Sequence, residues 1–186
     1  MASFALRCPS IFDRSFTNNT SAVKVPIPDE VLGQWHITHT SSPAWRDKRN
    51  VVLTYTTLSS RNHDATSLDD LITYQTLTSP QLQTMRGTDI SSTGKPGEWI
   101  WRGNGWLKFV TSHWQILGFG EQEERGQWAV VFAQKSLFSP AVINVYTRRK
   151  DGLDEEKLQE LKKILRSLGD GKWGDLVEVM YIVKQE

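Results

Sequence analysis

The sequence predicts an all-β fold: an eight-stranded antiparallel up-and-down barrel with a C-terminal flanking α-helix and a short ninth strand. Eight short stretches rich in β-branched and aromatic residues follow one another, separated by turn-forming residues. The hydrophobic period then changes from two to about three and a half near Leu153, and a last β-rich stretch follows. Closing such a sheet into a barrel removes the exposed edges that many short strands would otherwise leave.

Composition bounds the size and class of the protein. The chain has 186 residues, 38% hydrophobic and 23% charged, which suits one soluble domain with a buried core. We expect residues 1–25 to form a loosely held arm and residues 26–186 to form a single barrel domain. A formal net charge of +1, with basic and acidic residues interspersed, gives no support for nucleic-acid binding.

The same composition predicts a cytoplasmic location. No run of residues is apolar over the length of a membrane span. The N-terminal stretch lacks the apolar segment of a secretory signal, and Cys8 is the only cysteine, which favours a reducing compartment. Oligomeric state is left open.

The first two predicted strands lie on either side of a charged interruption. Side chains alternate along a strand, so Trp35, Ile37 and His39 share one face of the first strand, with Ser41 following. In the second strand, RNVVLTYTTL, one face carries Val51, Leu53, Tyr55 and Thr57. The six further strand candidates begin at Leu68, Gln83, Gly97, Ser112, Gly126 and Ala141. Periodicity does not decide whether residues 104–111 form a strand or a loop.

A helix is predicted over residues 154–168. Asp154 is a good N-cap, Leu153 and Leu158 are placed for a hydrophobic staple, and Gly169 suits the C-terminal stop. One apolar stripe runs along this helix, formed by Leu158, Leu161, Leu165 and Leu168. The stretch DLVEVMYIV, residues 175–183, predicts the ninth strand.

Two segments at the ends of the predicted barrel resemble lipocalin motifs. GQW at residues 33–35 resembles the Gly-x-Trp motif of the first lipocalin strand. VYTR, ending at Arg148, resembles the last barrel strand, whose arginine packs over that tryptophan. The helix and ninth strand also lie where the family has them, so the resemblance covers roughly residues 28–183. The middle TDY-type motif is not evident, and the disulfides of extracellular lipocalins are absent.

The resemblance implies a lipocalin-type barrel with Trp35 at its closed end and Arg148 in a structural role. THTSSPAW together with KRNVVLTYTTL is further similar to small lipocalin-like proteins of fungi. A barrel of this size holds either packed side chains or one small ligand. We therefore expect either a filled interior or a cavity for a small, largely apolar compound.

Candidate site residues follow from the inward faces. If Trp35 points inward, His39 and Tyr55 are expected to face the same interior, with His113 as a third group able to move a proton. Each could instead be an ordinary core residue. The expected ligand-binding residues, on strands and on the loop between the first two strands, are Trp45, Lys48, Arg49, Leu53, Tyr74, Trp99, Trp101 and Phe132. Within that loop, Trp45 would close over a ligand, and Lys48 and Arg49 could hold an anionic substituent.

No cofactor and no metal ion are expected. His36 and His39 would point to opposite faces of a strand, so they do not form a metal-binding pair. TGKPG lacks the pattern of a phosphate-binding loop, and Ser112 beside His113 is not a nucleophile elbow.

The resemblance implies two classes of function. One is a passive intracellular carrier or sensor of a small hydrophobic ligand. The other is a cofactor-free enzyme, because some fungal lipocalin-like proteins are natural-product cyclases, including hetero-Diels-Alderases. The polar groups His39, Tyr55 and His113 favour the enzyme. We therefore expect dehydration or cyclisation of a conjugated polyketide- or terpenoid-type compound in secondary metabolism, with the ligand itself unidentified.

Overall fold

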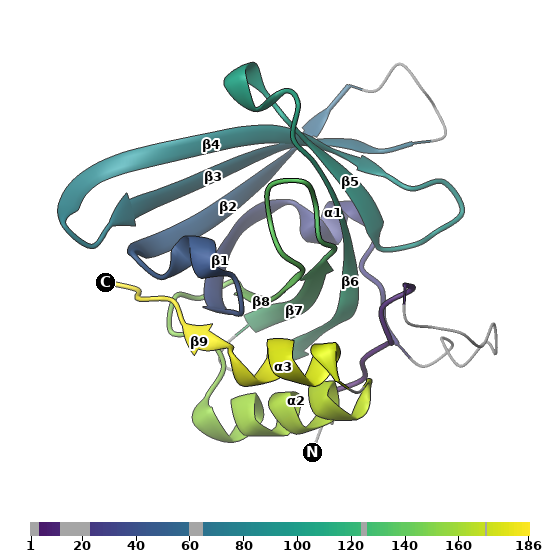
Figure 1. Cartoon of the computed structure of the whole chain (residues 1–186). Coiled ribbons are helices and arrows are strands. Elements are labelled where there is room, and N and C mark those ends of the chain that lie inside the picture. Colours follow the sequence, from purple (N-terminus) through teal and green to yellow (C-terminus); the bar gives the residue numbers. More distant parts are fainter. Residues whose placement is uncertain (1–3, 12–22, 60–64, 124–125, 170) are drawn as a thin grey trace.

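The computed structural model describes residues 4–11, 23–59, 65–123, 126–169 and 171–186. Its main feature is a closed antiparallel barrel, which confirms the predicted fold class (Figure 1). Each strand pairs with the next along the chain, and β1 pairs with both β8 and β2 to close the barrel. The barrel strands are β1 (Gly33–Thr40), β2 (Lys48–Leu58), β3 (Ser67–Thr76), β4 (Ser79–Ser91), β5 (Glu98–Gly103), β6 (Thr111–Gln122), β7 (Gly126–Ala133) and β8 (Val142–Thr147).

One end of the barrel is closed around Trp35, as the lipocalin resemblance implies. The short helix α1 (Pro28–Val31) covers this end, and the Trp35 indole N–H donates a 2.7 Å hydrogen bond to the Val31 carbonyl. The Arg148 guanidinium lies 3.7 Å from the centre of the Trp35 ring. It also donates hydrogen bonds to the main-chain carbonyls of Glu30 and Gln34. One arginine therefore joins α1, β1 and β8 over a buried tryptophan.

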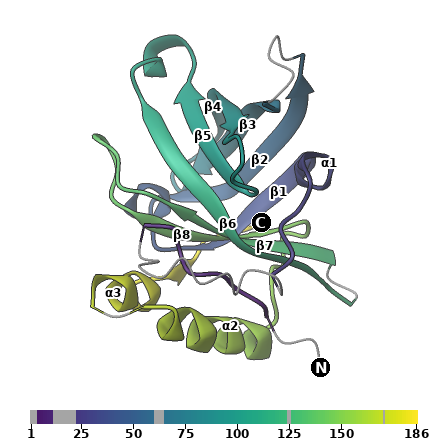
Figure 2. The same cartoon turned by 90° about the vertical axis from the view of Figure 1, so that its right-hand side faces the viewer.

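The predicted helix is α2 (Glu155–Ser167), which packs on the outside of the barrel (Figure 2). Asp154 caps it by accepting a 2.8 Å hydrogen bond from the Lys157 amide. Leu158, Leu161 and Leu165 are buried in a second core, which lies between the helices and the outer faces of β7 and β8. Within the described residues, no helix is long and apolar enough to cross a membrane.

The ninth strand is shorter than predicted. Residues 172–178 form helix α3 (Lys172–Glu178), and β9 comprises only Tyr181–Ile182, paired with β1. The helix is favoured because Trp173 and Val177, four residues apart, both face the second core. The Trp173 indole packs edge-on against Phe132 and donates a 2.6 Å hydrogen bond to the Leu165 carbonyl. Burial of one helical face thus overrides the β-propensity of this stretch.

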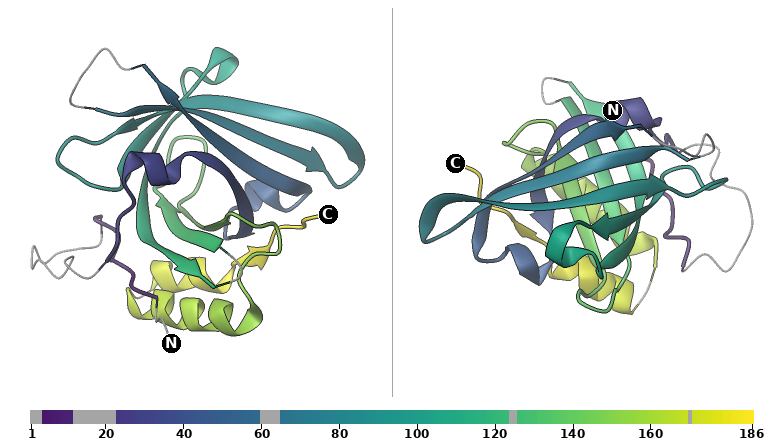
Figure 3. Two further views of the ribbon diagram at one scale, coloured as in Figure 1. Left: turned by 180° about the vertical axis from the view of Figure 1, so that it is seen from behind. Right: turned by 90° about the horizontal axis from the view of Figure 1, so that it is seen from above.

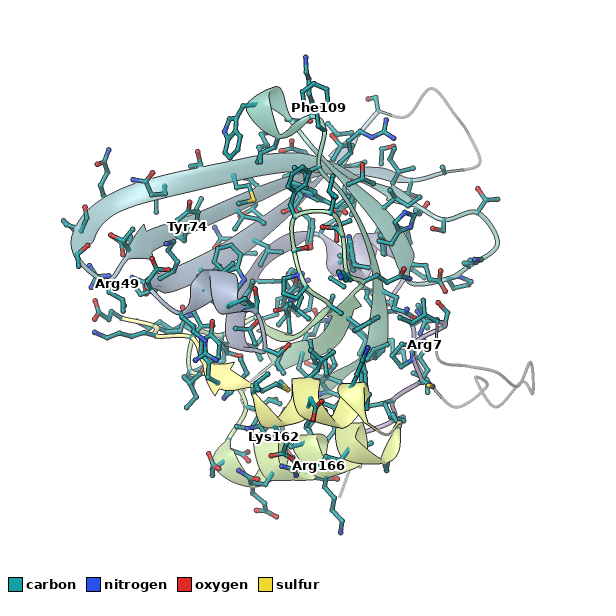
Figure 4. All side chains as sticks on the ribbon, viewed as in Figure 1. Arg7, Arg49, Tyr74, Phe109, Lys162 and Arg166 are labelled. Carbon is teal, nitrogen blue, oxygen red and sulfur yellow. The ribbon has the colours of Figure 1, made fainter. Side chains whose placement is uncertain are left out.

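The first part of the predicted loose arm is held against the barrel. Phe4 is buried against the Trp128 ring, with ring centroids 4.6 Å apart. Arg7, labelled in Figure 4, donates a 2.7 Å hydrogen bond from Nε to the Ile116 carbonyl. Gly118 leaves room for this segment, since a Cβ there would lie 2.3 Å from Leu6. Residues 12–22 of the predicted arm lie outside the described residues.

Candidate functional site

The barrel interior encloses a cavity of about 310 Å³. This volume is at the lower end of the range of about 300–1,000 Å³ that is typical of small-molecule sites. Its wall is mostly apolar, formed by Ile37, Ala44, Trp45, Leu53, Ile72, Met85, Trp101, Leu107, Val110, Trp114, Val131, Ala133, Phe138 and Val142. Its polar lining comprises Ser42, Tyr55, Asp70, Ser112, Ser139, Asn144 and Tyr146. The interior is hollow.

Aromatic rings form one rigid side of the cavity. The Tyr55 ring stacks on Trp114 with centroids 6.4 Å apart and planes 19° apart, and Trp114 stacks on Trp99 at 5.7 Å and 11°. Trp114 faces the cavity, whereas Trp99 lies behind it and does not line the space. Trp99 therefore supports the predicted ligand wall from behind.

Two tyrosines and an asparagine bring polar groups to the same cavity. Tyr55 comes from β2, and Asn144 and Tyr146 come from β8. The Tyr146 hydroxyl lies close to the side chains of Tyr55 and Asn144, and the Asn144 Oδ1 accepts a 2.6 Å hydrogen bond from the Thr40 hydroxyl. Burial raises the pKa of Tyr55 well above its ordinary value, and burial also raises that of Tyr146. Both hydroxyls therefore remain protonated near neutral pH and act as hydrogen-bond donors or acceptors.

One buried carboxyl group, Asp70, completes the polar wall, and a second, Asp89, is buried near it without lining the cavity. Asp70 lies directly opposite Tyr55 in the β2–β3 register and is only 3% exposed. Asp89 on β4 is fully buried, and its Oδ1 accepts a 2.6 Å hydrogen bond from the Trp114 indole N–H. Asp70 Oδ1 and Asp89 Oδ2 are buried without a hydrogen-bond partner. Burial, reinforced by the charges of Asp89 and Asp69, raises the pKa of Asp70 well above its ordinary value.

Trp101 pairs with Asp89 on β4, and it reaches the cavity because its diagonal neighbour on that strand, Gly87, has no side chain. Gly87 pairs with Asp70 on one side and Gly103 on the other. A Cβ on Gly87 would lie 2.3 Å from the Trp101 indole, so the ring occupies the space over this glycine. This close approach places the indole N–H next to Asp70 and favours the charged form of that carboxyl.

The mouth of the cavity is crossed by the loop between β1 and β2, as predicted. Trp45, in the 3₁₀ turn η2 (Pro43–Trp45), lines the cavity and packs edge-on against Tyr74 at 5.7 Å. The Tyr181 hydroxyl donates a 2.5 Å hydrogen bond to the Ser42 carbonyl, and Arg46 lies over the Tyr181 ring. Residues 104–111 contain a second 3₁₀ turn, η3 (Gly105–Leu107), and supply Leu107 and Val110 to the lining.

Lys48 and Arg49 do not line the cavity, contrary to the prediction. Both lie at the start of β2, and Figure 4 labels Arg49 there, near Tyr74 of the neighbouring strand β3. The Lys48 ammonium pairs with Asp47 and lies 5.8 Å from the Tyr74 ring. Arg49 pairs with Glu186 at the C-terminus. Their charges are compensated outside the barrel, so an anionic substituent inside the cavity would not meet them.

His39 lies outside the cavity, which corrects the prediction that it shares the interior with Tyr55. The register of β1 against β8 shifts between Ile37 and His39, so the alternation of faces is interrupted there. His39 instead borders a pocket between β1, β9 and α2, with Leu158 and Glu155. Burial lowers its pKa to about 4, so it is neutral at physiological pH. Ser41 also leaves the interior, and its hydroxyl accepts a hydrogen bond from the Ile143 amide.

His113 and Phe132 also lie outside the barrel interior. His113 is exposed and borders an outer groove with Arg7, Glu98 and Gln134. Phe132 packs in the second core against Trp173, while Ala129, Val131 and Ala133 form the inner face of β7. Both faces of β7 are apolar because α3 covers the outer one, so alternation alone did not indicate which face was inside. Of the predicted residues, Tyr55, Trp45, Leu53 and Trp101 line the cavity.

Asp70, Asn144 and Tyr146 were missed by the sequence-based prediction. The signal for Asp70 was present, since Leu68, Asp70, Ile72 and Tyr74 alternate along one predicted strand. An acid among inward apolar positions is rare without a partner or a function. In LDDLITY, Asp69 faces outward and pairs with Arg86, whereas Asp70 faces inward and lines the cavity.

Solved structures with a similar fold support the architecture. The siderocalin Ex-FABP superposes with a TM-score of 0.55 at 14% identity, over 84% of this chain and 95% of that one. The chain has the lipocalin fold. The cockroach allergen Per a 4 shows the same lipocalin-type likeness, with a TM-score of 0.55 and 14% identity over 83% of this chain and 85% of that one.

A curated protein with sequence similarity to this lipocalin-fold chain comes from a fungus. It is the Botcinic acid biosynthesis cluster B protein 12 of Botryotinia fuckeliana (strain B05.10), 24% identical over 168 residues. The match covers 87% of this chain and 76% of that protein. No model of a known protein family matches the chain.

Proposed function

We propose that the protein binds a small, largely apolar conjugated compound in the barrel cavity. We further propose that it catalyses cofactor-free dehydration or cyclisation of that compound in secondary-metabolite biosynthesis. The main support is the cavity itself, whose rigid aromatic side meets a cluster of buried polar groups. A relative from a biosynthesis cluster supports the same context.

The polar cluster is what favours an enzyme over a carrier. Burying a polar group without a partner destabilises a protein, and buried polar groups are usually satisfied. The cavity nevertheless holds an unpartnered carboxyl oxygen of Asp70 beside the Tyr55 and Tyr146 hydroxyls. A carrier of an apolar compound would bind it equally well in a smooth apolar cup. Groups that donate and accept protons next to a bound conjugated compound suit a reaction that moves a proton.

The cavity would contribute in two further ways. A quinone methide or a similar reactive intermediate is captured by water in solution, so an apolar enclosure would protect it. Holding two reacting groups in attack geometry contributes up to about 7–11 kcal/mol in well-oriented cases, more than one positioned proton donor. In this proposal Tyr55 donates a hydrogen bond to an oxygen of the substrate, and the stacked Trp114 holds its conjugated plane.

The proposed activity is tested with racemic 2-(1-hydroxyethyl)phenol and 2,3-dihydrofuran as model reactants. Loss of water from the first gives a quinone methide, and its cycloaddition to the second gives a fused chroman. We expect the wild-type protein to change both the rate and the isomer ratio of the chroman. Tyr55→Phe keeps the ring stack and should weaken the effect. The same isomer mixture at the same rate with and without protein, while the reactants bind, would support the alternative of a passive carrier or sensor.

A further inference from the structure

We infer that Asp70 is the proton-donating group of the cavity and that Asp89 keeps it protonated, so that the cavity selects neutral ligands with an acceptor oxygen and rejects carboxylates. This inference rests on the proposed ligand site and names its substrate class. It assigns a role to Asp70, and a second role to Asp89, which also accepts the indole hydrogen bond of Trp114 in the stacked aromatic wall.

The position of Asp70 supports this role. It lines the cavity at 3% exposure, and its Oδ1 is buried without a hydrogen-bond partner. It lies on the same cross-strand row as Tyr55 and Gly87, on the inner face of the sheet. A carboxyl group in this position is available to a ligand, and the Trp101 indole N–H, also without a hydrogen-bond partner, is the neighbouring donor.

The charges around Asp70 favour its protonated form. The charges of Asp89 on β4 and of Asp69, the preceding residue on β3, both disfavour a negative charge on Asp70. The uncharged hydroxyls of Tyr55 on β2 and Tyr146 on β8 lie near it. Of the described groups that act on Asp70, the Trp101 indole is the one that favours its ionised form. Among the described residues that line the cavity, none is a lysine, arginine or histidine. A negative charge on Asp70 would therefore be desolvated and repelled.

Asp89 is the member of the pair that ionises first. Its Oδ1 accepts the Trp114 indole hydrogen bond, which stabilises a negative charge there. Two carboxyl groups close together in an apolar site resist losing both protons. As the pH rises, the proton stays on Asp70, and the negative charge on Asp89 holds it there. Asp89 is thus a positioning residue that acts through Asp70.

A donor of this kind also fits the proposed dehydration. Asp70 gives its proton to the departing hydroxyl oxygen, the carbon–oxygen bond breaks with its electron pair on oxygen, and water leaves. The resulting carboxylate takes the proton of the phenolic hydroxyl of the same compound, whose electrons form the carbonyl of the quinone methide. One water is lost, and the Asp70 carboxyl is restored for the next turnover.

Binding of three matched probes tests the selectivity without any need for turnover. We expect 2-acetylnaphthalene to bind about fivefold to tenfold more tightly than 2-isopropylnaphthalene, which has the same shape without the acceptor. Naphthalene-2-carboxylate should bind more weakly than both. Asp70→Leu should remove the preference for the ketone while the hydrocarbon still binds. An equal affinity of the wild-type protein for the ketone and the hydrocarbon, or a preference for the carboxylate, would overturn the inference.

The protonation state is tested directly by NMR on protein labelled with ¹³C at the aspartate carboxyl carbons, with Asp70→Asn to assign the signal. We expect the Asp70 carboxyl to stay protonated at pH 7. Asp89→Asn retains an oxygen for the Trp114 hydrogen bond but removes the charge, so Asp70 should titrate at a lower pH. An ionised Asp70 at neutral pH, or an unchanged titration in the Asp89 variant, would contradict the inference. If these results hold but the model reactants are not converted, only the proposed catalysis fails.

Discussion

At the scale of single residues, the structure depends on a few side chains whose environments are unusual. Trp35 is almost fully buried at the closed end, and Arg148 both covers its ring and satisfies main-chain carbonyls. Asp70 is also buried, but it lines the cavity and its Oδ1 has no hydrogen-bond partner in the protein. Trp35 therefore stabilises the fold, whereas burial of Asp70 destabilises it.

Replacing Trp35 by alanine should lower the free energy of unfolding by about 3–5 kcal/mol, because a large buried aromatic is lost from the core. Denaturant unfolding measures this change. Trp106→Ala is the matched control, since Trp106 is 85% exposed and should contribute within about 0.5 kcal/mol. Equal, small losses in the two variants would contradict the structural role of Trp35.

The buried Asp70 should make stability depend on pH. Its pKa is raised by burial, so between its unfolded value of about 3.9 and its folded value the folded state holds a proton that the unfolded state has lost. Asp70 should therefore contribute a fall in the free energy of unfolding as the pH rises above about 4, which levels off above its folded pKa. Asp89, with its pKa raised to about 7, acts in the same direction, and His39, with its pKa lowered to about 4, acts in the opposite one. Asp70→Asn should remove the Asp70 contribution, so the free energy of unfolding of the wild type relative to that of the variant should fall from pH 4 to 8.

The control for this experiment is Glu123→Gln, which removes an acid from an exposed position. It should leave the slope unchanged. Because Asp89, whose pKa burial raises to about 7, contributes a slope of the same sign, the comparison between the two proteins is what decides. A slope in Asp70→Asn equal to that of the wild type would show that Asp70 is ionised in the folded protein.

The alternation of side chains along a strand correctly predicted some of the cavity-lining residues and misplaced others. Tyr55, Leu53 and Trp101 follow the regular alternation of strands that have one polar face, and they line the cavity as predicted. His39 follows a register shift in β1, which depends on pairing with β8 and leaves no mark in the local sequence. Phe132 belongs to a strand that is buried on both faces, so the sequence has no contrast between inside and outside.

At the scale of elements, the order of strands and the amphipathic helix α2 were predictable because each carries its own periodicity. The replacement of the predicted ninth strand by α3 was not, because the burial of Trp173 against the outer face of β7 decides it. The loop between β1 and β2 has one feature that the sequence predicts and one that a tertiary contact decides. Its position over the mouth follows from strand order, whereas its attachment to β9 through Tyr181 is a tertiary contact.

Trp45 on this loop should control ligand release. Its ring lines the cavity and packs on Tyr74, so Trp45→Ala opens the mouth without altering the polar wall. We expect the dissociation rate of N-phenyl-1-naphthylamine, a neutral fluorescent probe, to rise about tenfold in stopped-flow measurements, with a smaller change in association. Trp106→Ala again serves as the control. Unchanged dissociation from Trp45→Ala would show that the loop is not a lid.

At the scale of the whole molecule, the protein has two hydrophobic cores, one outside and one inside the barrel. The outer core joins α2 and α3 to β7 and β8, and these helices lie together beside one wall of the barrel (Figure 3). The inner core is incomplete, since the aromatic and aliphatic residues of the barrel leave a cavity of about 310 Å³. The outer core can support the barrel wall while the interior stays free to hold a ligand.

The most direct measurement is the binding of N-phenyl-1-naphthylamine to the wild-type protein and to a variant in which the cavity is filled. Ala133 lines the cavity on β7, so Ala133→Trp should occupy the space with an indole, whereas Lys135→Phe adds an aromatic ring at an exposed position nearby. If the barrel interior is the ligand site, the probe's fluorescence rises with saturation in the wild-type protein and in Lys135→Phe, and this response is lost in a folded Ala133→Trp. Equal binding by all three proteins, or no binding by the wild type, would contradict it.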